Sequence, residues 1–276
     1  MTKEVFNTKA ELFSYLIKNK SLIISERKTK LKVCDTFKYS QIETQYKDKA
    51  TKGFTLEIPT EQEVEEIIVK SVINTTNIMD SHHDVHIKGI WNKSLKENKN
   101  IYLLQEHDLS FKGVIAENVI ASVSEMDWKD LGFDGDGMTQ ALIFESKICE
   151  DRNEFMFEQY LNGYVKNHSV GMQYVTLYLC INDKEYKEEF ANWNKYISEV
   201  INRVDAEENG YFWAVTEAKI VEGSAVVIGS NPITPTLQII EINEPEESTL
   251  NDKTKPEVST LQKENVINSI NNFKFV

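Results

Sequence analysis

The sequence has few cysteines, and their arrangement fits neither a disulfide framework nor a zinc site. Cys34, Cys149 and Cys180 are scattered along the 276 residues, are odd in number and have no CxxC spacing. Disulfide scaffolds and structural zinc sites need paired or clustered cysteines. The pattern favours a protein of a reducing compartment.

An excess of positive charge is also missing. The chain has 31 Lys and Arg against 44 Asp and Glu, which gives a formal net charge of −13. A nucleic-acid-binding surface needs clustered Lys and Arg. The locally dense lysines of residues 18–32 are interrupted by Glu26 and lack an aromatic platform, so they are interpreted as a solvated face. We therefore expect no nucleic-acid partner.

Long apolar runs are absent as well. No segment approaches the length that spans a bilayer, and the first residues, "MTKEVFNTKAELF", lack the apolar segment of a signal peptide. We expect no membrane association and a cytosolic location. With 41% hydrophobic and 27% charged residues, the composition is typical of a globular protein that buries a substantial core.

Residues 1–50 are predicted to form an N-terminal extension with one short helix. Thr8 and Glu11 have the spacing of a capping box, which predicts a helix over residues 8–20. One stripe of this helix is apolar: Leu12, Phe13, Leu16 and Ile17. Residues 21–50 are rich in lysine and weakly patterned, so we place the extension outside the main core.

Residues 51–240 are predicted to form the main domain. From "GFTLEIP" onward the β-rich runs are "EIIVKSVINTTNI", "NIYLLQEHDL", "KGVIAENVIASV" and "TQALIFESKI". A helix, "CEDRNEFMFEQYLNGY", precedes a strand that begins near residue 168. An amphipathic helix over residues 183–210 is inserted before the last strand, "YFWAVTEAKIVEGSAVVIG".

Residues 241–276 are predicted to be a linker and tail. The segment begins with an acidic stretch that contains two prolines and almost no large apolar residue, a composition typical of a flexible linker. It closes with "LQKENVINSINNFKFV", a candidate short helix.

Ser169, in "HSVGM", is either a nucleophile or an ordinary polar residue at the start of a strand. Its neighbour His168 points to the other face of a strand, so a general base would have to come from elsewhere in the chain. The remaining histidines are His82, His83, His86 and His107. His107 ends an apolar run and precedes a turn, which is the best placement for a side chain at a sheet edge.

Glu222 is the candidate for the group that orients a histidine. In "AKIVEGSAVVIG" both strand faces are largely apolar, which indicates that Glu222 is buried. A buried carboxylate needs a partner, and a histidine or an arginine would serve. On spacing alone a structural ion pair ranks above catalysis. Glu217, on the opposite face in a more polar stretch, is the weaker candidate.

Two further patterns favour turns over metal sites. His82, His83 and His86, with Asp84 between them, could bind a metal, but no distant fourth ligand of clear type accompanies them. A polar turn is the favoured interpretation there. "DGDG" at residues 134–137 lacks the full calcium-loop pattern and also predicts a turn.

The order of several motifs resembles the tailed-phage prohead proteases, capsid maturation serine proteases similar in fold to herpesvirus assemblin. The segment "DVHIKGIWNKSL" looks like the stretch that leads toward the family's catalytic histidine. After it come "QEHD", "KGVIAE", a helix that ends in "NG", "HSVGM" and "IVEGSAVVIGSNP". The resemblance covers roughly residues 70–235, and it rests on the order and spacing of these motifs.

The resemblance implies an α+β fold built on a closed or nearly closed β-barrel with flanking helices. By position it makes Ser169 the nucleophile and His107 the general base. Glu222 matches an acidic position in the last core strand and becomes the third member, although related viral proteases use a second histidine there. It implies no cofactor and no metal, and Gly171 would let substrate approach the strand closely.

The implied substrates are the major capsid protein, scaffold and other head proteins. Cleavage would take place in the host cytoplasm inside the immature phage head, and the enzyme would also process its own tail. The insertion at 183–210 could cover part of the site or form the surface of a homo-oligomer. Two alternatives stay open: an inactive protease-fold scaffold or capsid component, and a metal-dependent hydrolase that uses His82, His83 and His86.

Overall fold

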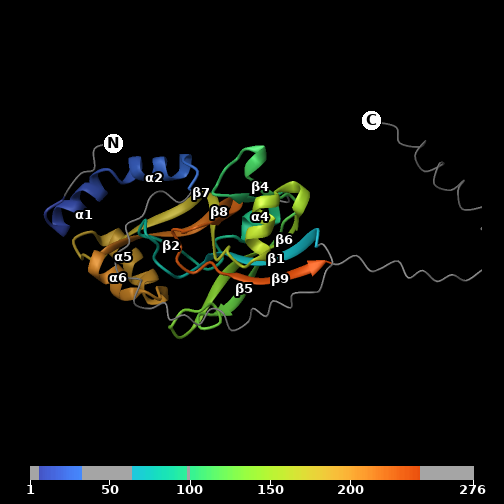
Figure 1. Ribbon diagram of the computed structural model, residues 1–276. Helices are drawn as coiled ribbons and strands as arrows, with labels where there is room; N and C mark the ends of the chain where they lie inside the picture. Colours follow the sequence, from blue (N-terminus) through green and yellow to red (C-terminus); the bar gives the residue numbers. More distant parts are fainter. Residues whose placement is uncertain (1–5, 33–63, 98–99, 243–276) are drawn as a thin grey trace, which may run out of the picture. The chain divides into compact units, whose positions relative to one another are not determined.

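A computed structural model describes residues 6–32, 64–97 and 100–242 of the chain (Figure 1). The expected mixed α+β class is confirmed. The strand expected at "GFTLEIP" lies outside the described residues, and so do residues 243–276 of the tail expected over 241–276. Residues 241 and 242 are the end of a strand and not part of a linker. None of the helices described is long and apolar enough to cross a membrane.

The first of two sheets has four antiparallel strands in the order β5-β6-β1-β9. Their bounds are β1 Glu66–Thr75, β5 Ile120–Asp127, β6 Met138–Cys149 and β9 Thr236–Ile242. Strand β1 falls within a predicted β-rich run, and β5 and β6 overlap two others and extend beyond them. Strand β9 was not expected, and it occupies the end of the predicted main domain.

The second sheet is built around the long strand β8. Strand β7 pairs antiparallel with one edge of β8. On the other edge, β2 pairs parallel with residues 213–215 and β3 pairs parallel with residues 223–225. Strand β4 completes the sheet by pairing with β3. The bounds are β2 Asp84–His86, β3 Leu103–Gln105, β4 Val114–Ala116, β7 Asn167–Ile181 and β8 Tyr211–Val226. Ladder pairing joins the described strands into two sheets and not into one closed barrel.

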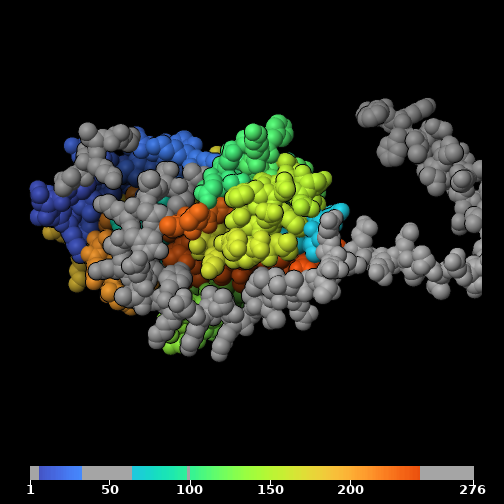
Figure 2. All heavy atoms as spheres, in the orientation of Figure 1, coloured from blue at the N-terminus to red at the C-terminus, as the bar shows by residue number. Residues whose placement is uncertain are grey.

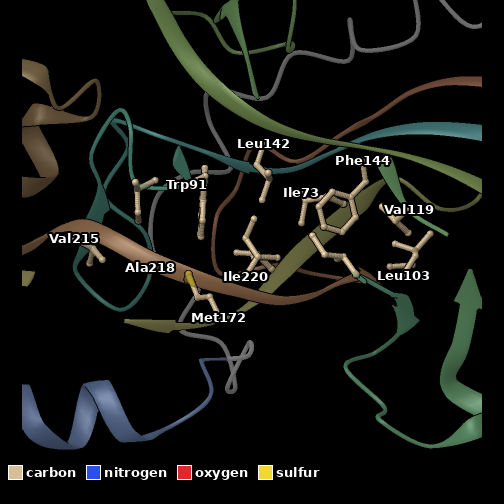
Figure 3. Close-up of a cluster of buried hydrophobic side chains, with 14 of the residues drawn as sticks. Ile73, Trp91, Leu103, Val119, Leu142, Phe144, Met172, Val215, Ala218 and Ile220 are labelled. Atoms are coloured by element: carbon tan, nitrogen blue, oxygen red, sulfur yellow. The ribbon is translucent and has the colours of Figure 1, made fainter. Parts of the chain in front are cut away.

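The core lies between the two sheets (Figure 3). Ile73 and Phe144 of the first sheet point toward Ile220 and Met172 of the second. The sheets approach closely at Gly223 of β8, where a Cβ atom would lie 2.4 Å from Cε2 of Phe144. This fixes which face of β8 is interior: the face of Gly223 packs on the core, and the alternate residues of that stretch point away from it.

Of the two helices at the N-terminal end, α2 (Lys20–Thr29) packs on β7 of the second sheet, and α1 (Lys9–Lys18) packs against α2. The expected cap is confirmed, since Oγ1 of Thr8 accepts a hydrogen bond from the backbone N–H of Glu11 at 3.2 Å. Phe13 and Leu16 are buried in the same cluster as the sheet residues. The expectation that this segment lies outside the main core is therefore wrong for α1, because its apolar stripe is part of that core. Helix α2 contributes only partly buried residues, Ile23 and Ile24.

The inserted segment is helical, as expected, but it is broken into α5 (Lys187–Tyr196), the 3-10 helix η4 (Ile197–Glu199) and α6 (Arg203–Asn209). The break is held by Asn202, whose side chain accepts a hydrogen bond from the N–H of Met79 and donates one to its carbonyl. Trp193 and Tyr196 pack with Phe212 of β8. The insertion thus covers the half of β8 that pairs with β2, and not the half that carries Glu222.

Three shorter helical elements connect the remaining strands: α3 (Asn92–Glu97), η2 (Phe111–Gly113) and η3 (Glu150–Arg152). The helix expected before β7 is α4 (Glu154–Leu161). Its N-cap is Asn153, whose side chain accepts from the N–H of Met156 at 3.2 Å. The chain leaves the helix through Gly163 at φ 68°, a conformation that glycine adopts without strain.

Candidate active site

Three neighbouring strands each bring one of the predicted site residues to the same face of the second sheet. Ser169 of β7 lies directly opposite Ser224 of β8, and Glu222 of β8 lies opposite Gly171 of β7. Residues that face each other across an antiparallel pair, and those two apart on one strand, share a face. This face is the one opposite the core. His107 follows β3, on the other side of β8.

His107 sits in a tight turn with unusual backbone angles. The N–H of Asp108 donates to the carbonyl of Gln105 at 2.8 Å, which closes a four-residue turn. The two central residues, Glu106 and His107, have φ of 49° and 59°. Positive φ at both positions is the mark of a type I′ turn, which normally takes Gly or Asn. Strain of this kind, on the order of 1–3 kcal/mol per residue, is found where the surroundings hold the turn in place.

The imidazole of His107 is held by Glu222. Nδ1 of His107 lies 2.7 Å from Oε1 of Glu222, and the two side chains are only 9% and 2% exposed. A carboxylate can only accept, so Nδ1 carries the hydrogen and donates it. Nε2 of His107 is buried and has no hydrogen-bond partner within the described chain. In the neutral form of this tautomer, Nε2 carries the unused lone pair that a general base requires. The expectation that buried Glu222 has a partner is confirmed.

Ser224 completes this arrangement and was missed in the sequence. Its hydroxyl donates to Oε2 of Glu222 at 2.7 Å, and its Oγ accepts the backbone N–H of His107 at 3.1 Å. Both carboxylate oxygens of Glu222 are thus occupied. The available signal was the spacing, because a residue two positions after Glu222 on one strand shares its face.

Ser169 is 5% exposed and lies one strand away from this cluster. Opposed Cβ atoms in an antiparallel pair are about 5 Å apart, so Ser169 is next to Ser224, which contacts His107. Among the described residues, the hydroxyl of Ser169 forms no hydrogen bond with Nε2 of His107. Such bonds are often long before substrate binds, so the geometry is compatible with a nucleophile and base that are not yet engaged.

His168 faces the other way, as expected. Its Nδ1 donates to the carbonyl of Thr234 at 3.1 Å, and Nε2 accepts from the hydroxyl of Tyr160 at 3.0 Å. Burial lowers the pKa of His168 to about 4. It is a neutral core histidine whose two ring nitrogens are both engaged.

Gly171 has a different role from the one expected. A Cβ atom on Gly171 would lie 1.8 Å from Oε1 of Glu222. The space above this glycine is therefore filled by the carboxylate and not open to substrate. The expectation of close substrate approach at Gly171 is wrong, because the side chain from the neighbouring strand occupies that position.

The histidine-rich segment begins as a turn, as expected: residues 81–83 are exposed or half-buried, and the N–H of His83 donates to the carbonyl of Asp80 at 3.1 Å. It then continues into the buried strand β2. His86 lies in β2, where burial lowers its pKa to about 4 and Nδ1 lies 2.9 Å from the side-chain amide nitrogen of Asn74. Nδ1 of His83 lies 2.9 Å from the hydroxyl of Tyr211. Within the part of the chain that the structure describes, no three His, Cys, Asp or Glu side chains are grouped as a metal would need. Glu217, the weaker acidic candidate, pairs with Lys93 at 3.1 Å.

The segment after His107 stands out from the surface beside α4 (Figure 2, green and yellow-green). It is attached there by Arg152 and Asn153, whose side chains donate to the carbonyls of Phe111 and Lys112. Leu109 and Phe111 of this segment are 68% and 90% exposed. Two large apolar side chains therefore face solvent within four residues of the imidazole.

Comparisons of this chain with models of protein families, with curated proteins and with solved structures find no match.

Proposed function

We propose that this protein is a serine endopeptidase of the kind that matures phage heads, with Ser169 as nucleophile, His107 as general base and Glu222 as the group that orients it. One observation carries the proposal. The His107 imidazole is fixed through Nδ1 to a buried carboxylate and presents a free Nε2 on the sheet face that carries Ser169. A base fixed by an acid beside a serine is the arrangement used in acyl transfer.

In the proposed reaction, Nε2 of His107 takes the proton of Ser169 as Oγ bonds to the scissile carbonyl carbon. The tetrahedral intermediate collapses, the C–N bond breaks, and the imidazolium returns its proton to the departing amine. Water then attacks the acyl-enzyme ester with the same base, and Ser169 recovers its proton. Glu222 stabilises the imidazolium at each stage, because it accepts the Nδ1–H at 2.7 Å. No step requires a metal or an organic cofactor.

We also propose that the two sheets form one nearly closed barrel of the assemblin type. Two contacts support closure between β7 and the start of β9. Asn167 forms an isolated bridge with Pro235, and the N–H of His168 donates to the carbonyl of Thr234 at 3.1 Å. These contacts join the second sheet to the first at the end that carries Ser169.

The substrate class in this proposal is the set of head proteins, namely the major capsid protein and scaffold, cleaved inside the immature head. The resemblance of the motif order around His107, Ser169 and Glu222 to prohead proteases supports it. Self-processing in the tail belongs to the same proposal, and its sites would lie outside the described residues. A homo-oligomer through the insertion stays a prediction.

An inactive protease-fold scaffold is the second candidate, and one observation favours it: in the described chain Ser169 is not hydrogen-bonded to His107. The metal-dependent alternative is not favoured, because His83 and His86 are engaged with Tyr211 and Asn74.

Coexpression with a phage major capsid protein and its scaffold, the substrates named in the proposal, separates these candidates. Wild type should give truncated head proteins with defined new termini, whereas Ser169→Ala should leave them intact. Ser122→Ala, an exposed strand serine on β5, is the matched control and should cleave like wild type. Intact substrates with wild type would favour the scaffold. Cleavage that EDTA abolishes and Ser169→Ala retains would favour a metal-dependent hydrolase.

A further inference from the structure

Ser224 links the two parts of His107 that a general base needs fixed, its backbone and its ring. The backbone N–H of His107 donates to Oγ of Ser224 at 3.1 Å, and the Ser224 hydroxyl donates to Oε2 of Glu222 at 2.7 Å. Oε1 of the same carboxylate accepts the Nδ1–H of the imidazole at 2.7 Å. These three hydrogen bonds close a ring that starts and ends on His107.

This closed set of hydrogen bonds holds the strained turn that contains His107. His107 and Glu106 both have positive φ, which is costly for residues with a Cβ atom. The backbone N–H groups of the turn are tied to β8 at two points: that of His107 donates to the hydroxyl oxygen of Ser224, and that of Glu106 donates to the carbonyl of Ala225 at 3.0 Å. Of these two backbone bonds, only the one to Ser224 depends on a side chain of β8. The carboxylate of Glu106 also accepts the N–H of Val227 at 3.2 Å.

Few side chains could replace Ser224. Its Oγ accepts and donates at once, it is fully buried, and it lies directly opposite the proposed nucleophile. Alanine at this position would leave Oε2 of Glu222 without its donor in a buried setting, and an unsatisfied buried charge is costly.

We propose that Ser224 is a positioning residue of the active site. It fixes the strained His107 turn and the Glu222 carboxylate relative to each other, so that Nε2 of His107 points toward Ser169. This inference rests on the proposed function. It adds a fourth side chain to the site, one that acts through His107 and Glu222 and not on the substrate.

The test follows the rate at which a fluorophosphonate labels Ser169 in the full chain, as a function of pH. In this reaction Oγ bonds to phosphorus, fluoride leaves, and His107 takes the proton, so no natural substrate is needed. The variants are Ser224→Ala and Ser224→Cys, which keeps the shape of the side chain but has only a weak S–H donor. Ser94→Ala is the matched control. Ser94 is also a buried serine bonded to β8, since its Oγ accepts the N–H of Ile220 at 2.9 Å.

Both Ser224 variants should label about 10- to 100-fold more slowly than wild type, the range expected for loss of a hydrogen bond to a charged group. The pH at which labelling reaches half of its maximal rate should be higher in both variants than in wild type. Without its donor, Oε2 carries more of the negative charge, and Glu222 then holds the imidazolium proton more tightly. Ser94→Ala should lower thermal stability without moving the pH profile. If Ser224→Ala does not fold, the labelling rate and pH profile of Ser224→Cys alone test the inference.

If the folded Ser224 variants label at wild-type rates with an unshifted pH profile, the positioning role of Ser224 is overturned and the proposed function is not. A profile that moves equally in Ser94→Ala would also overturn it, because the effect would then be general destabilisation. Failure of the proposed function has a different signature: Ser169 would not be labelled in wild type at all.

Discussion

The carboxylate of Glu222 occupies the place where a side chain of Gly171 would be. An added Cβ atom would lie 1.8 Å from Oε1 and 2.6 Å from the carboxyl carbon. The carboxylate of Glu222 on β8 thus requires a glycine at position 171 on β7, because the carboxylate and a Cβ atom would occupy the same space.

Gly171→Ala should therefore displace Glu222 and release the imidazole of His107. We expect a stability loss of about 1–3 kcal/mol, as for overpacking a buried site, and a large loss of fluorophosphonate labelling. In a Glu222→Ala background the same change should cost almost nothing, because the three atoms it would meet all belong to Glu222. Urea denaturation of the four proteins in this double-mutant cycle measures the coupling. If Gly171→Ala lowers the free energy of unfolding equally in both backgrounds, the clash with Glu222 is not the reason for the glycine.

His107 and His168 should differ sharply when replaced. His107→Ala should abolish labelling of Ser169, and wild-type labelling should rise with pH because only a neutral imidazole accepts the proton. His168→Ala removes bonds to Tyr160 and Thr234, so it should lower stability while the folded protein still reacts. The pKa of His168, which burial lowers to about 4, keeps it neutral from pH 5.5 to 8.

The measurement is the labelling rate per folded molecule, taken at low temperature across that pH range. An inactive His168→Ala beside an active His107→Ala would reverse the assignment of the base.

The candidate site could be predicted in part because its main members leave local signals. Glu222 stands in a strand that is apolar on both faces, which indicates a buried carboxylate in need of a partner. His107 ends an apolar run. Ser224 leaves only its spacing from Glu222, and the role of Gly171 leaves no local signal. Both roles depend on which strands are neighbours and in what register. A single sequence contains little information about that register.

The N-terminal helices could likewise be predicted only in part, because long-range contacts cannot be inferred from the sequence. Helix α1 was predicted from its cap and its apolar stripe. Helix α2 was missed because it has no fully buried residue and its sequence is strongly polar. Its attachment depends on Arg27, which pairs with the buried carboxylate of Asp84 and lies over the ring of Trp213 at 4.9 Å. An arginine in a polar segment gives no indication from sequence that it reaches a buried acid.

Arg27→Ala should therefore destabilise the whole domain. Breaking a buried ion pair from one side costs about 3–5 kcal/mol, and we expect the lower end because Nζ of Lys32 remains 3.8 Å from Asp84. Lys28→Ala, one residue further on the exposed side, should stay within about 0.5 kcal/mol of wild type. Urea unfolding measures both. If the two variants were equally stable, α2 would be an attached extension and not part of the core.

Asp80 should make stability depend on pH. Burial, together with the charge of Asp84, raises the pKa of Asp80 from the usual 3.8 to about 7. Between these values the folded state holds a proton that the unfolded state has lost. Stability from this group is therefore complete below about pH 4 and is lost as pH rises through about 7.

Asp80→Asn should remove this loss, because the amide is neutral and its oxygen can still accept the N–H groups of His82 and Asp84. Its stability relative to wild type should increase from pH 5.5 to pH 8, by a few kcal/mol at most. His86 and His168 titrate in both proteins and cancel in the difference. A difference that does not change with pH would show that Asp80 is already ionised at pH 5.5.

The most direct test of the central claim is the site at which a fluorophosphonate modifies the full-length protein. Intact mass and peptide mapping of wild type should show one adduct, on Ser169. Ser169→Ala should remain unmodified, with a labelling rate lower by on the order of a million-fold, as for loss of a triad nucleophile, while Ser122→Ala reacts like wild type. No adduct on the folded wild type, or an equal adduct on Ser169→Ala, would contradict the assignment of Ser169 as the nucleophile of a serine endopeptidase.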